Sequence, residues 1–260
     1  MSPGTLFNLR FLFSHLQSNF SMQVTRIAAL LEPFLGADNP PPTAEETLYH
    51  HISTYLDILL RWNARINLTA VHDPEEIVTR HFGESFFTAR HLFATVYPMP
   101  PVVSVVEDFY CVNDASLALR AHVADLGSGA GFPGIPIKLL VPGATVTLIE
   151  SNHKKAAFLR EVVRALKLAD VAVENNRAEN LRTNFDLVTL RAVERFAIAI
   201  RVAASLVRTS GRLALLISSR QFETVESTVP SFRWDPPIPI PLSKSRILVI
   251  GRQRQPREEP

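Results

Sequence analysis

The sequence has little of what extracellular and membrane proteins depend on. Its single cysteine, Cys111, excludes an intrachain disulfide framework and a multi-cysteine zinc site, as expected in a reducing compartment. It has no run of about 18 apolar residues, so no membrane span is expected. Arg10 interrupts the apolar residues near the start and no small-residue cleavage site follows, which argues against a signal peptide. We therefore expect a cytoplasmic protein that holds no metal.

The composition permits a nucleic-acid partner but does not demand one. The net charge of +2 and the pI of about 8.9 are only mildly basic. With 260 residues, 47% of them hydrophobic, the chain can bury one sizeable core and a smaller appendage. If Met22 is the true start, residues 1–21 are a disordered or spurious extension, which the intact mass of native protein would test.

Apolar periodicity predicts two helices followed by alternating strands and helices. The first helix opens at the capping-box pattern Thr43 to Glu46, and the second runs from Asp73-Pro74, an N-cap followed by proline, to about Phe93. From Ala121 the alternation is typical of a doubly wound α/β sheet. The expected strands are 121–126, 145–150, 171–174, 186–190 and 212–217, with helices at 135–140, 154–168 and 197–207 between them, an irregular edge strand at 232–240 and its partner at 246–250.

These elements predict a chain of five parts. They are an N-terminal extension that is partly disordered (1–42), a helical substrate-side subdomain (43–101), an insertion or hinge (102–120), a ligand-binding sheet domain (121–251) and a tail (252–260).

The most informative stretch is Val123–Gly134, which predicts a strand, a tight glycine loop and a helix start. Gly127, Gly129 and Gly131 fall on alternate positions, where each lets the backbone take a positive φ or approach a ligand closely. At the carboxyl end of a parallel strand, such a loop is the usual site of a nucleotide-like ligand.

Spacing separates the ligands that such a loop can hold. A P-loop needs Gly-Lys-Ser/Thr where this chain has Gly134-Ile-Pro136. A dinucleotide loop needs a third glycine where Phe132 stands, and Pro133 removes a donor N–H from the same turn. Asp125 would repel pyrophosphate but suits a cation. We therefore expect S-adenosylmethionine, which has ribose, adenine, an ammonium and a sulfonium but no phosphate.

Three further strand ends carry candidate residues, each with a plainer alternative. Glu150 ends the second strand and can accept hydrogen bonds from both ribose hydroxyls, or can be an exposed carboxylate. Asn176-Arg-Ala-Glu179 follows the third strand, where adenine should lie, or is merely a loop. Arg191 follows the fourth strand beside the switch point of the sheet, or is a solvated arginine.

Polar residues of the two front helices are harder to assign. Trp62-Asn63 and Asn67-Leu-Thr69 fit packing and turn roles. Arg80-His81 and Glu84-Ser85 lie one helical turn apart and share a face. From the residues alone, structural roles are favoured for all of them.

Together these motifs resemble the RsmG (GidB) family. The resemblance covers about residues 43 to 250 and is carried by Trp62-Asn63, Asn67-Leu-Thr69, Arg80-His81 with Ser85, Asp125-Leu-Gly-Ser-Gly-Ala-Gly-Phe-Pro-Gly-Ile-Pro136, Leu148-Ile-Glu-Ser-Asn-His-Lys-Lys-Ala-Ala-Phe-Leu159 and Arg191-Ala192. It implies a class-I (Rossmann-like) methyltransferase fold with a small N-terminal helical subdomain. It also implies methylation of N7 of a guanine in the decoding-region loop of 16S rRNA, from S-adenosylmethionine, on free rRNA or the small ribosomal subunit. No membrane is involved, and a monomer is expected.

The resemblance also implies roles for individual residues. Gly127 and Phe132 should contact S-adenosylmethionine at the loop, and Ala178 and Glu179 should meet its adenine end. We add Asp125, Gly129 and Glu150 to the cofactor-binding residues, and Arg191 belongs to both the cofactor and the substrate side. Because guanine N7 has a free lone pair, no general base is needed. Arg191 should position the base or the RNA backbone, with Arg80, Asn63 and Asn67 in support.

This chain departs from the family pattern at three places. The family usually has Asp where Glu84 stands, Ser where Leu190 stands, and Lys-Gly where Ile217-Ser218 stands. The last change removes a cation from the mouth of the site.

Three alternative functions are compatible with many of the same motifs. A class-I methyltransferase for a protein or small molecule would share the cofactor half and differ in the front helices. A non-catalytic ribosome- or RNA-binding relative would keep the fold. A nicotinamide dehydrogenase fits least, because of Phe132.

Overall fold

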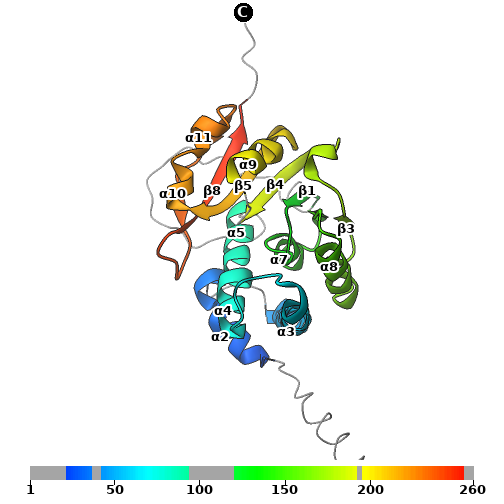
Figure 1. The fold of residues 1–260 in the computed structure, drawn as a ribbon. Helices are drawn as coiled ribbons and strands as arrows, with labels where there is room; N and C mark the ends of the chain where they lie inside the picture. The colour runs from blue at the N-terminus through cyan, green and yellow to red at the C-terminus, as the bar shows by residue number, and fades with distance from the viewer. Residues whose placement is uncertain (1–21, 37–41, 94–119, 192–194, 255–260) are drawn as a thin grey trace, which may run out of the picture.

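The computed structural model describes residues 22–36, 42–93, 120–191 and 195–254, with the side chains of 42–45 left aside. The predicted insertion or hinge at 102–120, apart from residue 120, and the possible extension at 1–21 lie outside the described residues. Helices cover both faces of a central sheet (Figure 1).

Within the described residues, eight strands form one mostly parallel sheet. The strands are β1 (His122–Leu126), β2 (Thr145–Ile149), β3 (Val171–Glu174), β4 (Phe185–Arg191), β5 (Val207–Ser218), β6 (Phe232–Trp234), β7 (Ile238–Pro239) and β8 (Arg246–Gln253). Their order is β3-β2-β1-β4-β5-β8-β6, and β7 pairs with β8. β1 to β5 are parallel, whereas β8 runs antiparallel to β5. The predicted doubly wound α/β sheet is confirmed.

The strand order reverses between β1 and β4, which makes the carboxyl ends of these strands the switch point. Leu126 on β1 pairs with Leu190 on β4. The glycine loop and Arg191 therefore leave neighbouring strands at the same edge, which is where a doubly wound sheet binds its ligand.

Alternating strand residues divide the apolar core into two clusters, one on each face. Val123 and Leu187 pack with α7 (Gly134–Leu140), α8 (His153–Ala165) and the front helices. Their neighbours Ala124 and Val188 pack with α9 (Phe196–Ser205), α10 (Ser219–Phe222) and α11 (Val225–Thr228). A period of two with both faces apolar is what a buried parallel sheet requires.

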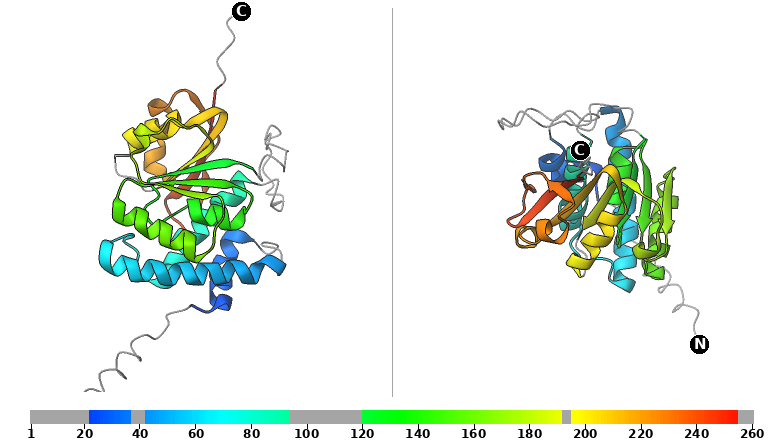
Figure 2. Two further views of the ribbon diagram at one scale, coloured as in Figure 1. Left: turned by 90° about the vertical axis from the view of Figure 1, so that its right-hand side faces the viewer. Right: turned by 90° about the horizontal axis from the view of Figure 1, so that it is seen from above.

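The front helices lie on the α7–α8 side of the sheet. They are α2 (Val24–Leu35), α3 (Pro42–Ile66), α4 (Pro74–Ile77), the π-helix η1 (Val78–Gly83) and α5 (Glu84–Leu92). In Figure 2, α3 runs along α8 on the side away from the strands. The predicted N-cap is confirmed, because the Asp73 side chain accepts a hydrogen bond from the Glu76 N–H at 2.8 Å with Pro74 next to it.

Two boundaries differ from the sequence analysis. Helix α2 lies in the predicted extension 1–42, yet Ile27, Leu31 and Phe34 are buried in the larger apolar cluster, so residues 22–36 belong to the fold. At the other end, β8 runs to Gln253 and pairs there with Phe232, so the strand continues into the segment assigned to the tail.

Candidate functional site

The glycine loop is built as its sequence predicts. Gly127, Gly129 and Gly131 have φ values of 69°, 54° and 86°, a region that L-residues with a Cβ rarely adopt. The N–H groups of Gly127 and Ser128 donate to the carbonyl of Ile149 at 2.9 and 3.1 Å, which ties the loop to the end of β2. A Cβ added at Gly129 would have only the Gly127 carbonyl oxygen nearby, at 3.7 Å. The loop is therefore open at Gly129, where a ligand can approach the backbone.

Asp125 lies beneath this loop, with 1% of its surface exposed. Its Oδ1 accepts a hydrogen bond from the Thr189 hydroxyl at 2.8 Å, and its Oδ2 accepts one from the Gly134 N–H at 3.2 Å. Burial raises the pKa of this carboxyl to about 6, although the hydrogen bonds from Thr189 and Gly134 act in the opposite direction. Asp125 thus joins β4 and the start of α7 to the end of β1.

Glu150 lies beside the same loop and is only 7% exposed, so it is not the exposed carboxylate of the alternative interpretation. Its Oε2 accepts from the Gly129 N–H at 3.0 Å and its Oε1 from the Asn152 N–H at 2.7 Å. Asn175 donates to the Glu150 backbone carbonyl at 2.8 Å. Each carboxylate oxygen has a second lone pair left to accept another donor. These hydrogen bonds orient the Glu150 side chain, and its oxygens can still accept hydrogen bonds from ribose hydroxyls.

Ala178 and Glu179 form the 3-10 turn η2 (Ala178–Asn180) after β3, at the same edge of the sheet as the glycine loop. Glu179 is exposed, and Ala178 is half-buried against the apolar cluster of α9. The structure thus places this pair two strands away from the loop.

Phe132 points into the front helices, where it forms an aromatic cluster with Tyr55 and Phe82. Its ring stacks on Tyr55 at 5.3 Å between centroids and meets the edge of Phe82 at 5.0 Å. The Tyr55 hydroxyl also donates to the backbone carbonyl of Ala130 in the loop. With 6% of its surface exposed, the Phe132 side chain anchors the loop to α3 and η1.

Arg191 lies against three polar groups of the front helices. Its Nη2 donates to the Arg80 backbone oxygen at 2.6 Å, lies 3.1 Å from Nδ1 of His81, and pairs with Oε2 of Glu84 at 3.0 Å. The other oxygen of Glu84 accepts from Nε of Arg246 at 2.5 Å. Glu84 is 1% exposed, so one buried carboxylate serves two arginines from β4 and β8.

The buried His81 ring is held between Arg191 and Thr69 and is neutral. Burial, followed by the charges of Arg191 and Arg80, lowers its pKa to about 2. Its Nδ1 lies 3.1 Å from Nη2 of Arg191, and its Nε2 lies 2.6 Å from the Thr69 hydroxyl. Since both ring nitrogens are engaged, His81 positions its neighbours and is not a proton acceptor.

The remaining predicted front-helix residues lie around this chain of contacts. Asn63 is buried, and its Oδ1 accepts from the Thr69 N–H at 2.9 Å, so it holds the segment that reaches His81. Asn67 is exposed with φ of 47°, a turn conformation that asparagine tolerates. The Arg80 side chain pairs with Glu76 at 2.6 Å, so it is the backbone of Arg80 that contacts Arg191.

Sequence reasoning missed three residues that complete the site. Thr189 is an ordinary strand position, and nothing in its neighbours indicates a bond to Asp125. Tyr55 has the periodicity of a core residue, which conceals its bond to the glycine loop. Arg246 begins β8 and reaches Glu84 across 162 positions of sequence.

The comparisons with known proteins identify the family of this chain. The family model for rRNA small subunit methyltransferase G (GidB) matches residues 48–95 and 105–233, well over half of the chain. The chain belongs to this family. The RsmG family consists of S-adenosylmethionine-dependent methyltransferases that act on 16S rRNA.

Two relatives illustrate the similarity within the RsmG family. Ribosomal RNA small subunit methyltransferase G of Stenotrophomonas maltophilia is 42% identical over 161 residues, which are 61% of this chain and 64% of that protein. The protein of the same name from Xylella fastidiosa is 36% identical over 205 residues, 77% of this chain and 84% of its own. The chain thus spans just under two thirds of the first relative and most of the second.

Solved structures with a similar fold include a ribosomal protein L11 methylase from Lactobacillus delbrueckii. It is 17% identical, has a TM-score of 0.48, and the match covers 66% of this chain and 80% of that chain.

Proposed function

We propose that this protein transfers the methyl group of S-adenosylmethionine to N7 of a guanine in the decoding-region loop of 16S rRNA. Membership of the RsmG family supports the activity and the substrate. The observation that carries the proposal is the contact of Arg191, at the switch point, with η1 and α5. This contact supports the proposal, because it links the motif residues of the helical part to the switch point, where a sheet of this kind binds its ligand.

The residues at the crevice fit S-adenosylmethionine. Gly129 leaves the backbone open, Glu150 offers carboxylate lone pairs for the ribose hydroxyls, and Ala178 and Glu179 lie along the edge toward the adenine end. Asp125 supports a cationic ligand with its charge and holds the loop through Gly134. When bound, the cofactor supplies the methyl group as an electrophile.

The protein's own contribution is alignment. Guanine N7 attacks with its own lone pair, so no residue has to remove a proton first. His81 agrees with this, because its pKa of about 2 makes it too weak a base to remove a proton near pH 7. Both of its ring nitrogens also lie against protein groups, Thr69 and Arg191. Arg191, oriented by Glu84 and His81, would hold the base or its phosphate in line with the methyl group. Asn63 and Arg80 would support Arg191 indirectly. Asn63 holds Thr69, which contacts His81, and Arg80 contacts Arg191 through its backbone carbonyl.

We propose further that the protein works in the cytoplasm as a monomer, on 16S rRNA or the small subunit. None of the described helices is long and apolar enough to cross a membrane. Sedimentation of the purified protein across a range of concentrations tests the monomer.

The deciding experiment is labelled-methyl transfer. Purified small subunits that lack the modification, and protein-free 16S rRNA, are each incubated with the protein and labelled S-adenosylmethionine, and the labelled nucleotide is located by nuclease digestion and mass spectrometry. We expect 7-methylguanosine at one site in the decoding-region loop. Glu150→Gln should lose cofactor affinity, whereas Glu161→Gln, on the side of α8 that meets α3, serves as the control.

Two results would contradict the proposal. Label in ribosomal proteins, or in another nucleotide, would indicate a methyltransferase with a different substrate. Tight cofactor binding without transfer to either form of rRNA would indicate a non-catalytic relative.

A further inference from the structure

The turn between β7 and β8 (residues 240–245, the β7–β8 turn) presents an apolar side chain in an unfavourable backbone conformation. Leu242 is 72% exposed, more than the other exposed large apolar residue of the described segments, Ile198 at 52%. Its φ is 57°, in the left-handed region. The Ser243 N–H donates to the Ile240 carbonyl at 3.2 Å, which puts Pro241 and Leu242 at the centre of a β-turn. Proline followed by a positive φ is the type II pattern, in which glycine or asparagine normally takes the position of Leu242.

Hydrogen bonds fix the β7–β8 turn to its surroundings. The Arg246 N–H donates to the Ser243 hydroxyl at 2.9 Å, and the Ile240 N–H to the Arg246 carbonyl at 3.2 Å. The Ser219 N–H donates to the carbonyl of Ser245 at 2.9 Å, so the turn is also fixed to the start of α10. The side chain of Leu242 is therefore held out from the surface by a bonded scaffold.

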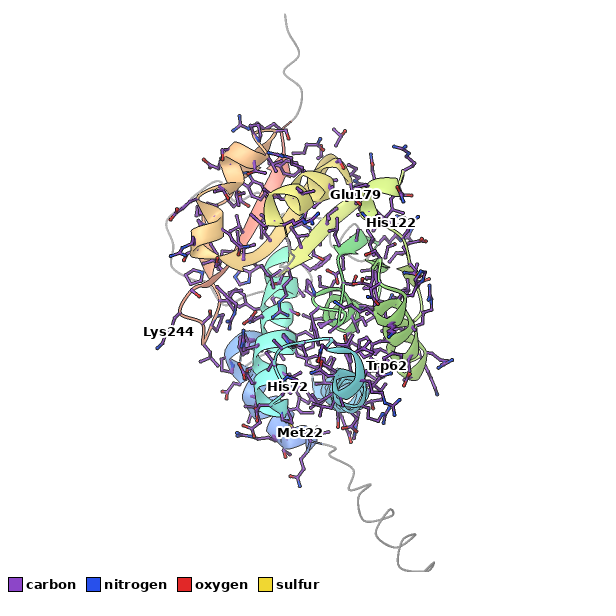
Figure 3. All side chains as sticks on the ribbon, in the orientation of Figure 1. Met22, Trp62, His72, His122, Glu179 and Lys244 are labelled. Carbon is purple, nitrogen blue, oxygen red and sulfur yellow. The ribbon has the colours of Figure 1, made fainter. Side chains whose placement is uncertain are left out.

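The residues near Leu242 carry positive charge that suits a polyanionic ligand. They lie at the same edge of the sheet as the candidate site. Lys244 and Arg220 are exposed, and Figure 3 shows Lys244 at the outer margin of the molecule. Residues 236–250 and 217–222, which meet here, contain no carboxylate. Arg246, at the base of the turn, shares Glu84 with Arg191, which connects the turn to the switch point. Cations around an exposed apolar side chain are suited to phosphates on either side of a base stack.

We propose that Leu242 is a wedge that enters 16S rRNA beside the target guanine and takes up the space from which that base is withdrawn. A base that is to be methylated at a ring atom in a confined crevice must leave its stack, and inserted apolar side chains stabilise the opened step. Lys244 and Arg220 would hold the flanking phosphates. This inference rests on the proposed function, since it names how that substrate is engaged.

The test uses the positive φ of Leu242, because glycine adopts this conformation without strain. Leu242→Gly removes the side chain and relieves the left-handed conformation, so the variant should be at least as stable as the wild type. Its kcat/KM on unmodified small subunits should fall about tenfold or more, the scale expected when one inserted or stacked side chain is lost. Leu242→Met keeps a large apolar side chain at the same position and should stay within about twofold of the wild type, a difference of roughly 0.4 kcal/mol. Ile198→Ser, on α9, is the matched control for removing an exposed apolar residue.

The affinity for S-adenosylmethionine, measured by calorimetry, should be the same in all four proteins. If Leu242→Gly methylates as well as the wild type, or if its cofactor affinity falls in parallel, the wedge is wrong. If the wild type itself transfers no methyl group to rRNA, the proposed function has failed instead. A photoreactive benzoylphenylalanine at position 242 identifies the partner, because crosslinks to 16S rRNA support the wedge and crosslinks to a ribosomal protein overturn it.

Discussion

Replacing Asp125 by asparagine should make the protein more stable at neutral pH and a worse binder of its cofactor. The side chain is fully buried between Thr189 and Gly134. An asparagine of the same shape can turn its oxygen to the Gly134 N–H and its amide to the Thr189 hydroxyl, which can accept. The substitution therefore removes a charge without leaving a donor unpaired.

The magnitude follows from the pKa. Burial raises the pKa of Asp125 from 3.8 to about 6, so the folded state binds a proton more tightly than the unfolded chain. The stabilising effect of this proton is complete below pH 4 and is lost as the pH rises from about 4 to 6. Above that window the ionised carboxylate costs the fold about 3 kcal/mol. The neutral amide would avoid this cost, so Asp125→Asn should exceed the wild type by up to about 3 kcal/mol at pH 8 and match it near pH 4.

Urea unfolding at pH 8, 6 and 4 measures this difference, and calorimetry measures the affinity for S-adenosylmethionine. We expect the affinity to fall about tenfold or more, because a cationic ligand loses attraction on the order of 1.4 kcal/mol. A variant that is less stable than the wild type at pH 8, or a stability difference that does not vary with pH, would refute the reasoning about burial. Unchanged cofactor affinity would show that the charge of Asp125 does not serve the ligand.

Three further predictions concern the front helices. Glu84→Gln leaves Arg191 and Arg246 without their buried carboxylate and should lower the free energy of unfolding in urea by about 3–5 kcal/mol. The control Glu76→Gln removes an exposed ion pair and should cost less than about 1 kcal/mol. Equal losses in the two variants would contradict a stabilising role of the Glu84 ion pairs. Gly83→Ala puts a Cβ 2.5 Å from the Phe34 ring and should cost about 1–3 kcal/mol, seen as a lower Tm, which an unchanged Tm would disprove. His81, whose pKa is lowered to about 2, stabilises the fold fully above pH 6.5 and should contribute a loss of about 1.4 kcal/mol per pH unit below it, which His81→Gln would lack in acid unfolding curves.

The cofactor half was predictable because its signals are local. A positive φ every second residue requires glycine, and a strand of a buried parallel sheet requires an apolar run, so Gly127–Gly131 and β1 could be located from adjacent letters. Glu150 and Arg191 were found by counting strand ends, since parallel strands end at one edge. The roles predicted for these residues stay predictions until cofactor binding is measured.

The helical half was less predictable because its contacts are set by tertiary packing. Helix α2 lies ahead of a proline-rich stretch and contains Pro33, neither of which favours a helix, yet burial of its apolar face holds it in the fold. The bond between Glu84 and Arg246 spans most of the chain, and no pattern of spacing indicates it. Phe132 was predicted to contact the cofactor, which stays a prediction, and the sequence did not indicate that its ring packs against Tyr55 and Phe82.

The position of Arg191 explains why the two halves depend on each other. Its three polar partners come from η1 and α5, although the arginine itself ends a strand of the sheet. The glycine loop is held in the same way, by Tyr55 of α3 bonding to Ala130. The front helices therefore hold both the loop at the end of β1 and the arginine at the end of β4. A boundary drawn between 43–101 and 121–251 divides the sequence, but these contacts join the helices to the sheet on both sides of the switch point.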